Sequence, residues 1–180
     1  TSHVVTSWVK AVANAFKAGH SGTLDPQVSG VLPIGINYST PALKYVLHSP
    51  KGYVGVMKLH GEVDMESLNK AFSIFKGRLY QRPPKKSAVR RKLRTREVYS
   101  LKILEVDGRN VLFRLECESG FYVRKLAHDI GLVLGVEAHL SELRRIKSGP
   151  YTEDETLVTL HDVALAFTAW RRGESSLIKQ

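Results

Sequence analysis

The sequence contains a single cysteine, Cys117, among its 180 residues. One thiol can form neither a disulfide within the chain nor a cysteine-rich zinc site, so we expect a reducing compartment. No apolar run approaches the ~20 residues that span a bilayer, and no signal peptide is visible. We therefore expect neither a disulfide-stapled secreted domain nor a membrane protein.

Metal-binding patterns are also lacking. The seven histidines are spread along the chain without the compact spacing of a ligand set. His128 precedes Asp129 directly, but a His-Asp pair on a helix is more often part of the surface than of a metal site. We therefore predict no metal.

Acidic residues are few compared with basic ones. The chain has 27 lysines and arginines against 17 aspartates and glutamates, and its formal net charge is +10. A length of 180 residues fits one domain with a substantial core. The surplus of positive charge favours a polyanionic partner, most simply nucleic acid, because neutralised phosphates release counterions.

Part of this charge is concentrated in one segment. No acidic residue occurs between Arg82 and Arg96, and Pro83-Pro84 disfavours a helix there. We expect a mobile basic loop at about residues 80–96, which contacts RNA phosphates; a solvated charged surface is the alternative. The residues assigned to RNA contact are Lys85, Lys86, Arg90, Arg91, Lys92 and Arg94.

Residues 19–30 contain three glycines and a proline, a composition that suits neither a helix nor a central strand. The apolar run 31–36 follows at once, should be buried, and would anchor this loop. Asp25 stands at the centre of the loop, and Pro26 biases its backbone towards an extended conformation. A carboxylate on an anchored irregular segment is a candidate for chemistry, although Asp-Pro is also a common turn.

The hydrophobic pattern predicts an α+β fold with a mixed, mainly antiparallel sheet and helices packed against it. Helices are expected to begin at about residues 2, 41, 65, 123 and 160. The first should run to about Ala18 and end at Gly19. Strands are expected over residues 51–59, 98–106, 111–117 and 138–146. Asp107-Gly108 is typical of a hairpin turn between two of these strands, and Cys117 should be buried.

Several motifs resemble one family. Residues 19–26 (GHSGTLDP), followed by 29–33 (SGVLP), resemble the catalytic motif of the TruB-type pseudouridine synthases. The serine in HSGT resembles the form of this motif in the dyskerin branch, which comprises the H/ACA guide-RNA enzymes of archaea and eukaryotes. Residues 81–84 (QRPP) and 117–124 (CESGFYVR) resemble further segments in the family's order. The resemblance covers nearly the whole chain and implies a bent sheet with the catalytic cleft across its middle.

The resemblance implies three catalytic residues. Asp25 would act as nucleophile, either on the base or on the ribose C1′, or would abstract a ribose proton. Arg124 would pair with Asp25 and keep the carboxylate ionised. Tyr53 would stack on the uracil and take or relay the C5 proton. The plainer alternatives are that Arg124 is an ordinary surface residue and that Tyr53 serves only to pack the fold.

The resemblance also implies which residues form the substrate pocket and whether the reaction requires a cofactor. His20 would occupy the place of the flipped-out nucleotide, with Tyr122 and Leu143 beside the pocket. Isomerisation involves no redox change and no external group transfer, so no cofactor is expected.

The implied function is the isomerisation of specific uridines in rRNA or tRNA by the catalytic subunit of an H/ACA guide ribonucleoprotein. Its partners would be substrate RNA, guide RNA and the small H/ACA proteins. Two alternatives stay open: a stand-alone synthase for the tRNA T-loop uridine, and a non-catalytic RNA-binding scaffold. The location would be cytoplasmic in an archaeon and nucleolar in a eukaryote.

The resemblance also suggests domain boundaries. Residues 1–170 would form the catalytic domain, whose first motif starts before residue 1, and 171–180 would be a frayed tail. We expect no counterpart of the family's RNA-binding PUA domain within these 180 residues.

Overall fold

The computed structural model describes residues 1–82 and 92–174. The helices are α1 Ser2–Val12, the 3-10 helix η1 Asn37–Ala42, α2 Leu43–His48, α3 Met65–Ile74, α4 Val123–Leu134, α5 Glu153–Thr156 and α6 Leu160–Arg171. The strands are β1 Ala18–His20, β2 Ser29–Gly30, β3 Ile34–Ile36, β4 Lys51–Leu59, β5 Gly77–Gln81, β6 Arg94–Asp107, β7 Asn110–Cys117, β8 Ala138–Ser148 and β9 Tyr151–Thr152.

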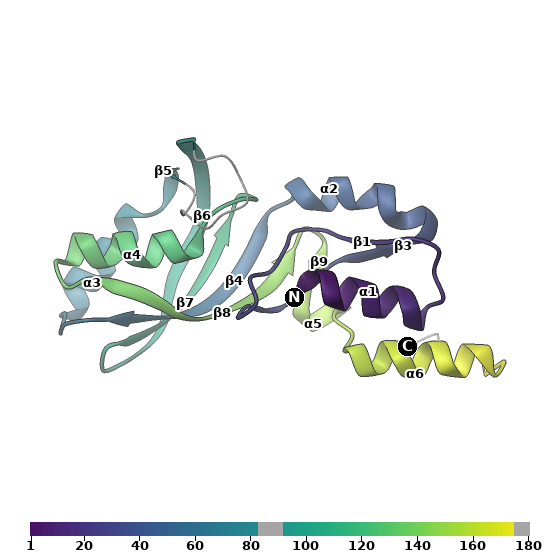
Figure 1. Ribbon diagram of the computed structural model, residues 1–180. Coiled ribbons are helices and arrows are strands. Elements are labelled where there is room, and N and C mark those ends of the chain that lie inside the picture. The colour runs from purple at the N-terminus through teal and green to yellow at the C-terminus, as the bar shows by residue number, and fades with distance from the viewer. Residues whose placement is uncertain (83–91, 175–180) are drawn as a thin grey trace.

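One sheet of seven strands organises the molecule (Figure 1). Its order is β2-β8-β4-β7-β6-β5, and β9 pairs with β8 off this path. The strands pair antiparallel except for β2, which runs parallel to β8. Register shifts interrupt β4 against β8 and β6 against β7, and such bulges bend strands. The predicted mixed, mainly antiparallel sheet with flanking helices is confirmed.

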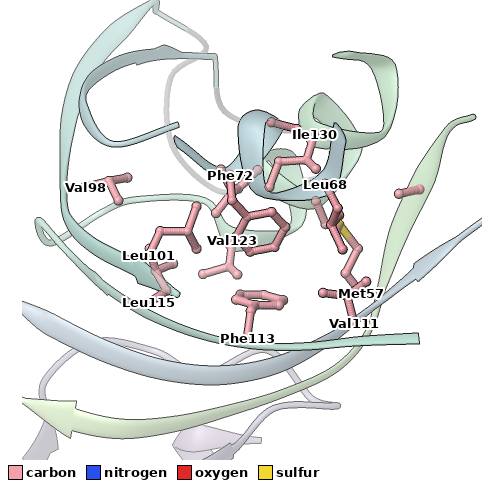
Figure 2. Packing of buried hydrophobic residues seen from close by; sticks show 14 of the residues in the cluster. Met57, Leu68, Phe72, Val98, Leu101, Val111, Phe113, Leu115, Val123 and Ile130 are labelled. Atoms are coloured by element: carbon pink, nitrogen blue, oxygen red, sulfur yellow. The ribbon is translucent and has the colours of Figure 1, made fainter. Parts of the chain in front are cut away.

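The main core lies between this sheet and the helices α3 and α4 (Figure 2). Residues of β7 alternate towards it as predicted: Val111, Phe113, Leu115 and Cys117 are all buried. Asp64 caps α3 by accepting a 2.8 Å hydrogen bond from the Ser67 backbone N–H. The sheet and the start of α4 are therefore held by one apolar cluster.

A second part of the fold packs beside β8. The short strands β1 and β3 pair antiparallel in a sheet of their own, surrounded by α1, α2 and α6. The segment between β1 and β3 contains Asp25 and reaches the main sheet through β2 (Figure 1). Asp25 thus lies where the two parts of the fold meet.

The prediction that the first helix extends to Ala18 is wrong. The helix ends at Val12, and Asn14 adopts a positive φ of 49° that breaks it. Residues 18–20 instead pair with β3, which satisfies backbone groups that a helix would have used. Phe16 does not join a buried helix face and is 63% exposed.

The boundaries of the predicted basic loop need correction. Residues 77–81 form strand β5, which the sequence analysis missed, and β6 begins at Arg94 rather than near residue 98. The two strands pair from Gly77 opposite Val98 to Gln81 opposite Arg94. Alternation lets charged residues occupy this strand end, since every second side chain faces away from the core. Residues 83–91 lie outside the described part of the chain.

One other boundary differs from the prediction, and another is confirmed. The helix expected at Pro41 is preceded by a 3-10 turn that contains this proline, and α2 begins at Leu43. The last helix begins as predicted, because Thr159 and Asp162 form a capping box. Helix α6 ends at Arg171; of the tail predicted to fray, residues 175–180 lie outside the described residues.

Candidate functional site

The loop that contains Asp25 is held at both ends. At one end, buried Ser21 donates from its backbone N–H to the Pro33 carbonyl at 2.9 Å. At the other, Val31 N–H donates to the Arg145 carbonyl at 2.8 Å. Gly30 has a φ of +106°, and a Cβ there would lie 2.1 Å from the Arg145 carbonyl oxygen. The glycine is therefore required for the close approach of β2 to β8.

The start of α1 supports the same loop from the other side. Leu24 N–H donates to the buried Ser2 hydroxyl at 2.9 Å. Within the loop, Val28 N–H donates to the Asp25 carbonyl at 2.9 Å and closes a turn. The Asp25 backbone is thus fixed while its side chain remains exposed.

A buried arginine, Arg145, lies beneath this loop. It is 2% exposed; its Nε donates to the Val31 carbonyl and its Nη2 to the Gly22 carbonyl, each at 2.8 Å. The guanidinium therefore joins two loop residues that flank Asp25. Burial lowers the pKa of Arg145, with the nearby Tyr53 opposing that shift. The sequence analysis placed Leu143, two positions before Arg145, beside the pocket but did not identify Arg145 itself.

Asp25 and Arg124 form the ion pair expected from the sequence. Arg124 Nη2 lies 2.9 Å from Asp25 Oδ2, and the side chains are 56% and 52% exposed. Arg124 stands in the first turn of α4, where a cation meets the positive end of the helix and gains from a carboxylate partner. The adjacent Lys125 pairs with Asp129 instead. Because exposed ion pairs add at most ~1 kcal/mol to stability, this pair is better suited to chemistry than to holding the fold together.

The ion pair borders a cavity of about 350 Å³. Asp25, Arg124 and Leu143 all line it, so three of the predicted site residues meet there. A larger, apolar cavity of about 700 Å³ also reaches Asp25, between α1, β3, α2 and α6. The smaller cavity combines an ion pair with an apolar wall, as sites for small polar rings do.

Tyr53 lies on β4, opposite Arg145 of β8 and Leu115 of β7. Burial raises the pKa of Tyr53 to about 12; Cys117 and Asp25 also raise it, and Arg145 opposes them. The side chain is therefore a neutral phenol near pH 7. It is electrostatically coupled to Asp25 but does not line the smaller cavity.

His20 and Tyr122 are placed at the edge of this arrangement, and neither lines the smaller cavity. The His20 ring bonds the Thr6 hydroxyl at 3.1 Å and the Thr23 hydroxyl at 3.4 Å, which links α1 to the loop. Burial lowers the pKa of His20, and His3 and Arg145 lower it further, so the imidazole is neutral near pH 7. Tyr122 is the N-cap residue of α4, two positions before Arg124.

Two more buried polar residues were not singled out from the sequence. Lys51 is 4% exposed, and its Nζ donates to three carbonyls, those of Val46, Leu47 and Ser49. Burial lowers the pKa of Lys51 to about 8, with Arg145 adding to the effect. Gln81 is 3% exposed and contacts the backbone of Tyr122. The partners of Lys51 lie two to five positions before it, whereas the partner of Gln81 lies 41 positions away, so no local pattern marks Gln81.

Of the predicted RNA-contact residues, Lys92 is exposed and Arg94 is partly buried at the start of β6. Lys85, Lys86, Arg90 and Arg91 lie outside the described residues. Over residues 1–82 and 92–174, no three His, Cys, Asp or Glu side chains are grouped so that they could hold a metal ion. In the same ranges, no helix has the length and apolarity needed to cross a membrane.

Family profiles match both halves of the chain. Residues 10–123 match the TruB family pseudouridylate synthase N-terminal domain. Residues 124–180 match the tRNA pseudouridylate synthase B C-terminal domain. The first match contains Asp25 and Tyr53, and the second begins at Arg124.

Curated relatives agree with these profiles. A Pyrococcus abyssi protein named "Probable tRNA pseudouridine synthase B" is 53% identical over 171 residues, which cover 95% of this chain and 51% of the relative. The protein of that name from Methanothermobacter thermautotrophicus is 50% identical over 181 residues, covering 100% of this chain and 56% of the relative. The chain thus spans about half the length of these relatives.

Solved structures share the fold. One described as "Crystal Structure of a Cbf5-Nop10-Gar1 Complex" matches with a TM-score of 0.92 and 51% identity, covering 96% of this chain and 53% of that one. One described as "Structure of H/ACA RNP bound to a substrate RNA containing 2'-deoxyuridine" matches with a TM-score of 0.87 and 47% identity, covering 96% and 51%. Because the N-terminal domain profile matches residues 10–123, more than half of the chain, the chain belongs to the TruB family of pseudouridylate synthases.

Proposed function

We propose that this protein isomerises uridine to pseudouridine in RNA, with Asp25 as the catalytic carboxylate. The observation that carries the proposal is the 2.9 Å ion pair between Asp25 and Arg124 at the mouth of a cavity. Isomerisation needs a carboxylate that stays ionised beside a bound ring. A guanidinium in contact favours the ionised form.

The reaction breaks the bond between ribose C1′ and N1, turns the base and joins C1′ to C5. The proton on C5 leaves, and N1 gains one, so the atoms balance without a cofactor. Asp25 either forms a bond to the base or to C1′, or removes a ribose proton to start the cleavage. Arg124 holds the carboxylate in place and stabilises its charge.

Tyr53 contributes as a neutral phenol. Its pKa of about 12 leaves little phenolate near neutral pH, so it does not take the C5 proton unaided. A phenol can instead stack on the uracil ring and relay the proton through its hydroxyl. Its coupling to Asp25 is consistent with this role.

The target nucleotide must leave its stack to reach the cavity. We place Leu143 against the base, because it lines the cavity with Asp25. We assign His20 and Tyr122, which do not line the cavity, to holding the RNA rather than the reacting ring. Phosphate contacts come from the basic residues that include Lys92 and Arg94, and such contacts carry no sequence information.

The substrate is rRNA or tRNA, and an H/ACA guide RNA selects the target uridine. The protein itself assembles with the small H/ACA proteins. Support comes from the likeness to Cbf5 in complexes with Nop10 and Gar1 and in an H/ACA particle with substrate RNA. The names of the curated relatives favour the second candidate, a stand-alone tRNA synthase. The curated relatives named above come from archaea, and for an archaeal protein we propose the cytoplasm.

One assay separates these readings. Uridine isomerisation is measured on tRNA and on rRNA fragments, with and without guide RNA and partner proteins. We expect turnover that depends on guide RNA. Turnover on tRNA alone would favour the stand-alone synthase, and RNA binding without any product would favour the scaffold.

A further inference from the structure

A buried glutamine, Gln81, forms hydrogen bonds to the start of the helix that contains Arg124. It is the last residue of β5 and is 3% exposed. Its Oε1 accepts from the Tyr122 backbone N–H at 2.9 Å, and its Nε2 donates to the Tyr122 carbonyl at 3.1 Å. One side-chain amide thus binds both polar groups of a single backbone residue.

This contact stands where α4 lacks a cap of its own. Its N-cap residue, Tyr122, makes no side-chain capping hydrogen bond. Two cations, Arg124 and Lys125, occupy the first turn, where the helix dipole disfavours positive charge. The first backbone N–H groups of a helix need outside partners. Gln81 supplies support from a different part of the chain.

The Tyr122 carbonyl also accepts from the Lys125 and Leu126 N–H groups, each at 3.1 Å. Gln81 therefore acts on the residue that sets the first turn, and Arg124 projects from that turn. The ion pair of Arg124 with Asp25 is about half exposed and too weak to fix the backbone by itself. A catalytic group must be held within ~0.5 Å of its productive place.

We propose that Gln81 is a positioning residue, which sets Arg124 against Asp25 by fixing Tyr122 at the start of α4. This inference rests on the proposed function of the same site. It adds that the strands β5 and β6, which hold Gln81, set the position of Arg124 relative to Asp25. Gln81 lies opposite Arg94 in that ladder, so the same two strand ends hold a predicted RNA-contact residue.

The test uses the full-length protein assembled with its RNA and protein partners. Gln81→Met keeps the length of the side chain and removes both hydrogen bonds, and Gln81→Glu keeps an acceptor for the Tyr122 N–H. The matched control is Tyr80→Phe, on the same strand and 73% exposed. Single-turnover rate, RNA affinity and the melting temperature are measured for each.

We expect Gln81→Met to slow the single-turnover rate by about tenfold or more, because small displacements of reacting groups are costly. RNA affinity should stay within about twofold, since Gln81 is 3% exposed and both lost hydrogen bonds are neutral and internal to the protein. The single-turnover rate of Gln81→Glu should lie between those of the wild type and Gln81→Met. If Gln81→Met does not fold, Gln81→Glu serves as the test variant. Hydrogen exchange should quicken at the Tyr122 amide while the later turns of α4 stay protected.

A double-mutant cycle with Arg124→Ala distinguishes positioning from a structural role. If Gln81 acts through Arg124, the rate penalty of Gln81→Met disappears in the Arg124→Ala background. An equal penalty in both backgrounds, or an unchanged rate with faster exchange at Tyr122, would overturn the inference alone. A wild-type protein that makes no pseudouridine on any RNA would overturn the proposed function, and the inference with it.

Discussion

Arg145 Nη2 donates a 2.8 Å hydrogen bond to the Gly22 carbonyl, which ties the loop that contains Asp25 to β8. The neighbouring Nε makes an equivalent bond to Val31, so one buried cation fastens the loop on both sides of Asp25. Sequence neighbours could not supply this bridge. The loop's conformation therefore depends on a residue more than a hundred positions away in the chain.

Replacing Arg145 should loosen the loop and destabilise the protein. In Arg145→Met, the Gly22 and Val31 carbonyls lose their donors, which should lower the free energy of unfolding by ~2–4 kcal/mol. The single-turnover rate should fall with it. Arg144→Met is the matched control, because its partly exposed ion pair with Glu153 and its hydrogen bond to the Ser29 hydroxyl should contribute ~1 kcal/mol or less. Chemical denaturation measures both, and equal losses would contradict the assignment.

Stability should rise with pH in a window set by Lys51. Burial, then Arg145, lower its pKa to about 8 in the folded chain, against ~10.4 when unfolded. Between these values the unfolded chain binds more protons, so the free energy of unfolding increases with pH. Denaturation at several pH values should give a more positive slope in the wild type than in Lys51→Met, because the raised pKa values of buried Cys117 and Tyr53 act in the opposite sense in both proteins. The exposed Lys58→Met should keep the wild-type slope.

The pH dependence of the single-turnover rate should show no ionisation of Tyr53 below about pH 10. Burial raises the pKa of Tyr53 to about 12, so the phenol stays protonated through that range. Tyr53→Phe should nevertheless slow single turnover by about 10²-fold, the loss expected for a proton-relay group. A Phe variant as fast as the wild type would limit Tyr53 to stacking.

RNA affinity should lose part of its salt dependence when the basic segment is neutralised. Replacing Arg90, Arg91 and Lys92 by alanine should weaken binding and reduce the slope of log affinity against log salt by ~0.7–0.9 for each lost phosphate contact. Affinity titrations at several salt concentrations measure this.

The control for this experiment carries the same change in charge elsewhere. Lys70, Lys76 and Arg78 are exposed on or next to α3 and β5, outside the basic segment. Their triple alanine variant should keep the wild-type slope. An unchanged slope in the basic-segment variant would refute its assignment to phosphate contact.

Much of the fold follows from local patterns. Alternation along β7, the Asp107-Gly108 turn and the apolar spacing of α4 predicted elements that the structure contains. The pairing of Asp25 with Arg124 was expected because each stood in a motif that resembled one family. Spacing alone would not have joined them.

The rest depended on contacts between distant segments. Strand β5 forms because β6 pairs with it, and its own sequence has weak strand preference. Helix α1 stops early because the following residues pair with β3. Buried Arg145 and Gln81 resemble surface residues in the sequence, and only the carbonyls they meet in the fold show their roles.

The most direct test of the account is the Asp25→Asn variant of the full-length protein, assayed for pseudouridine on its RNA. Asparagine keeps the size of the side chain and removes its charge, so no product should form while RNA affinity is retained. Asp154→Asn, at an exposed position on α5, should isomerise uridine at the wild-type rate. If Asp25→Asn forms pseudouridine as fast as the wild type, the catalytic assignment is wrong.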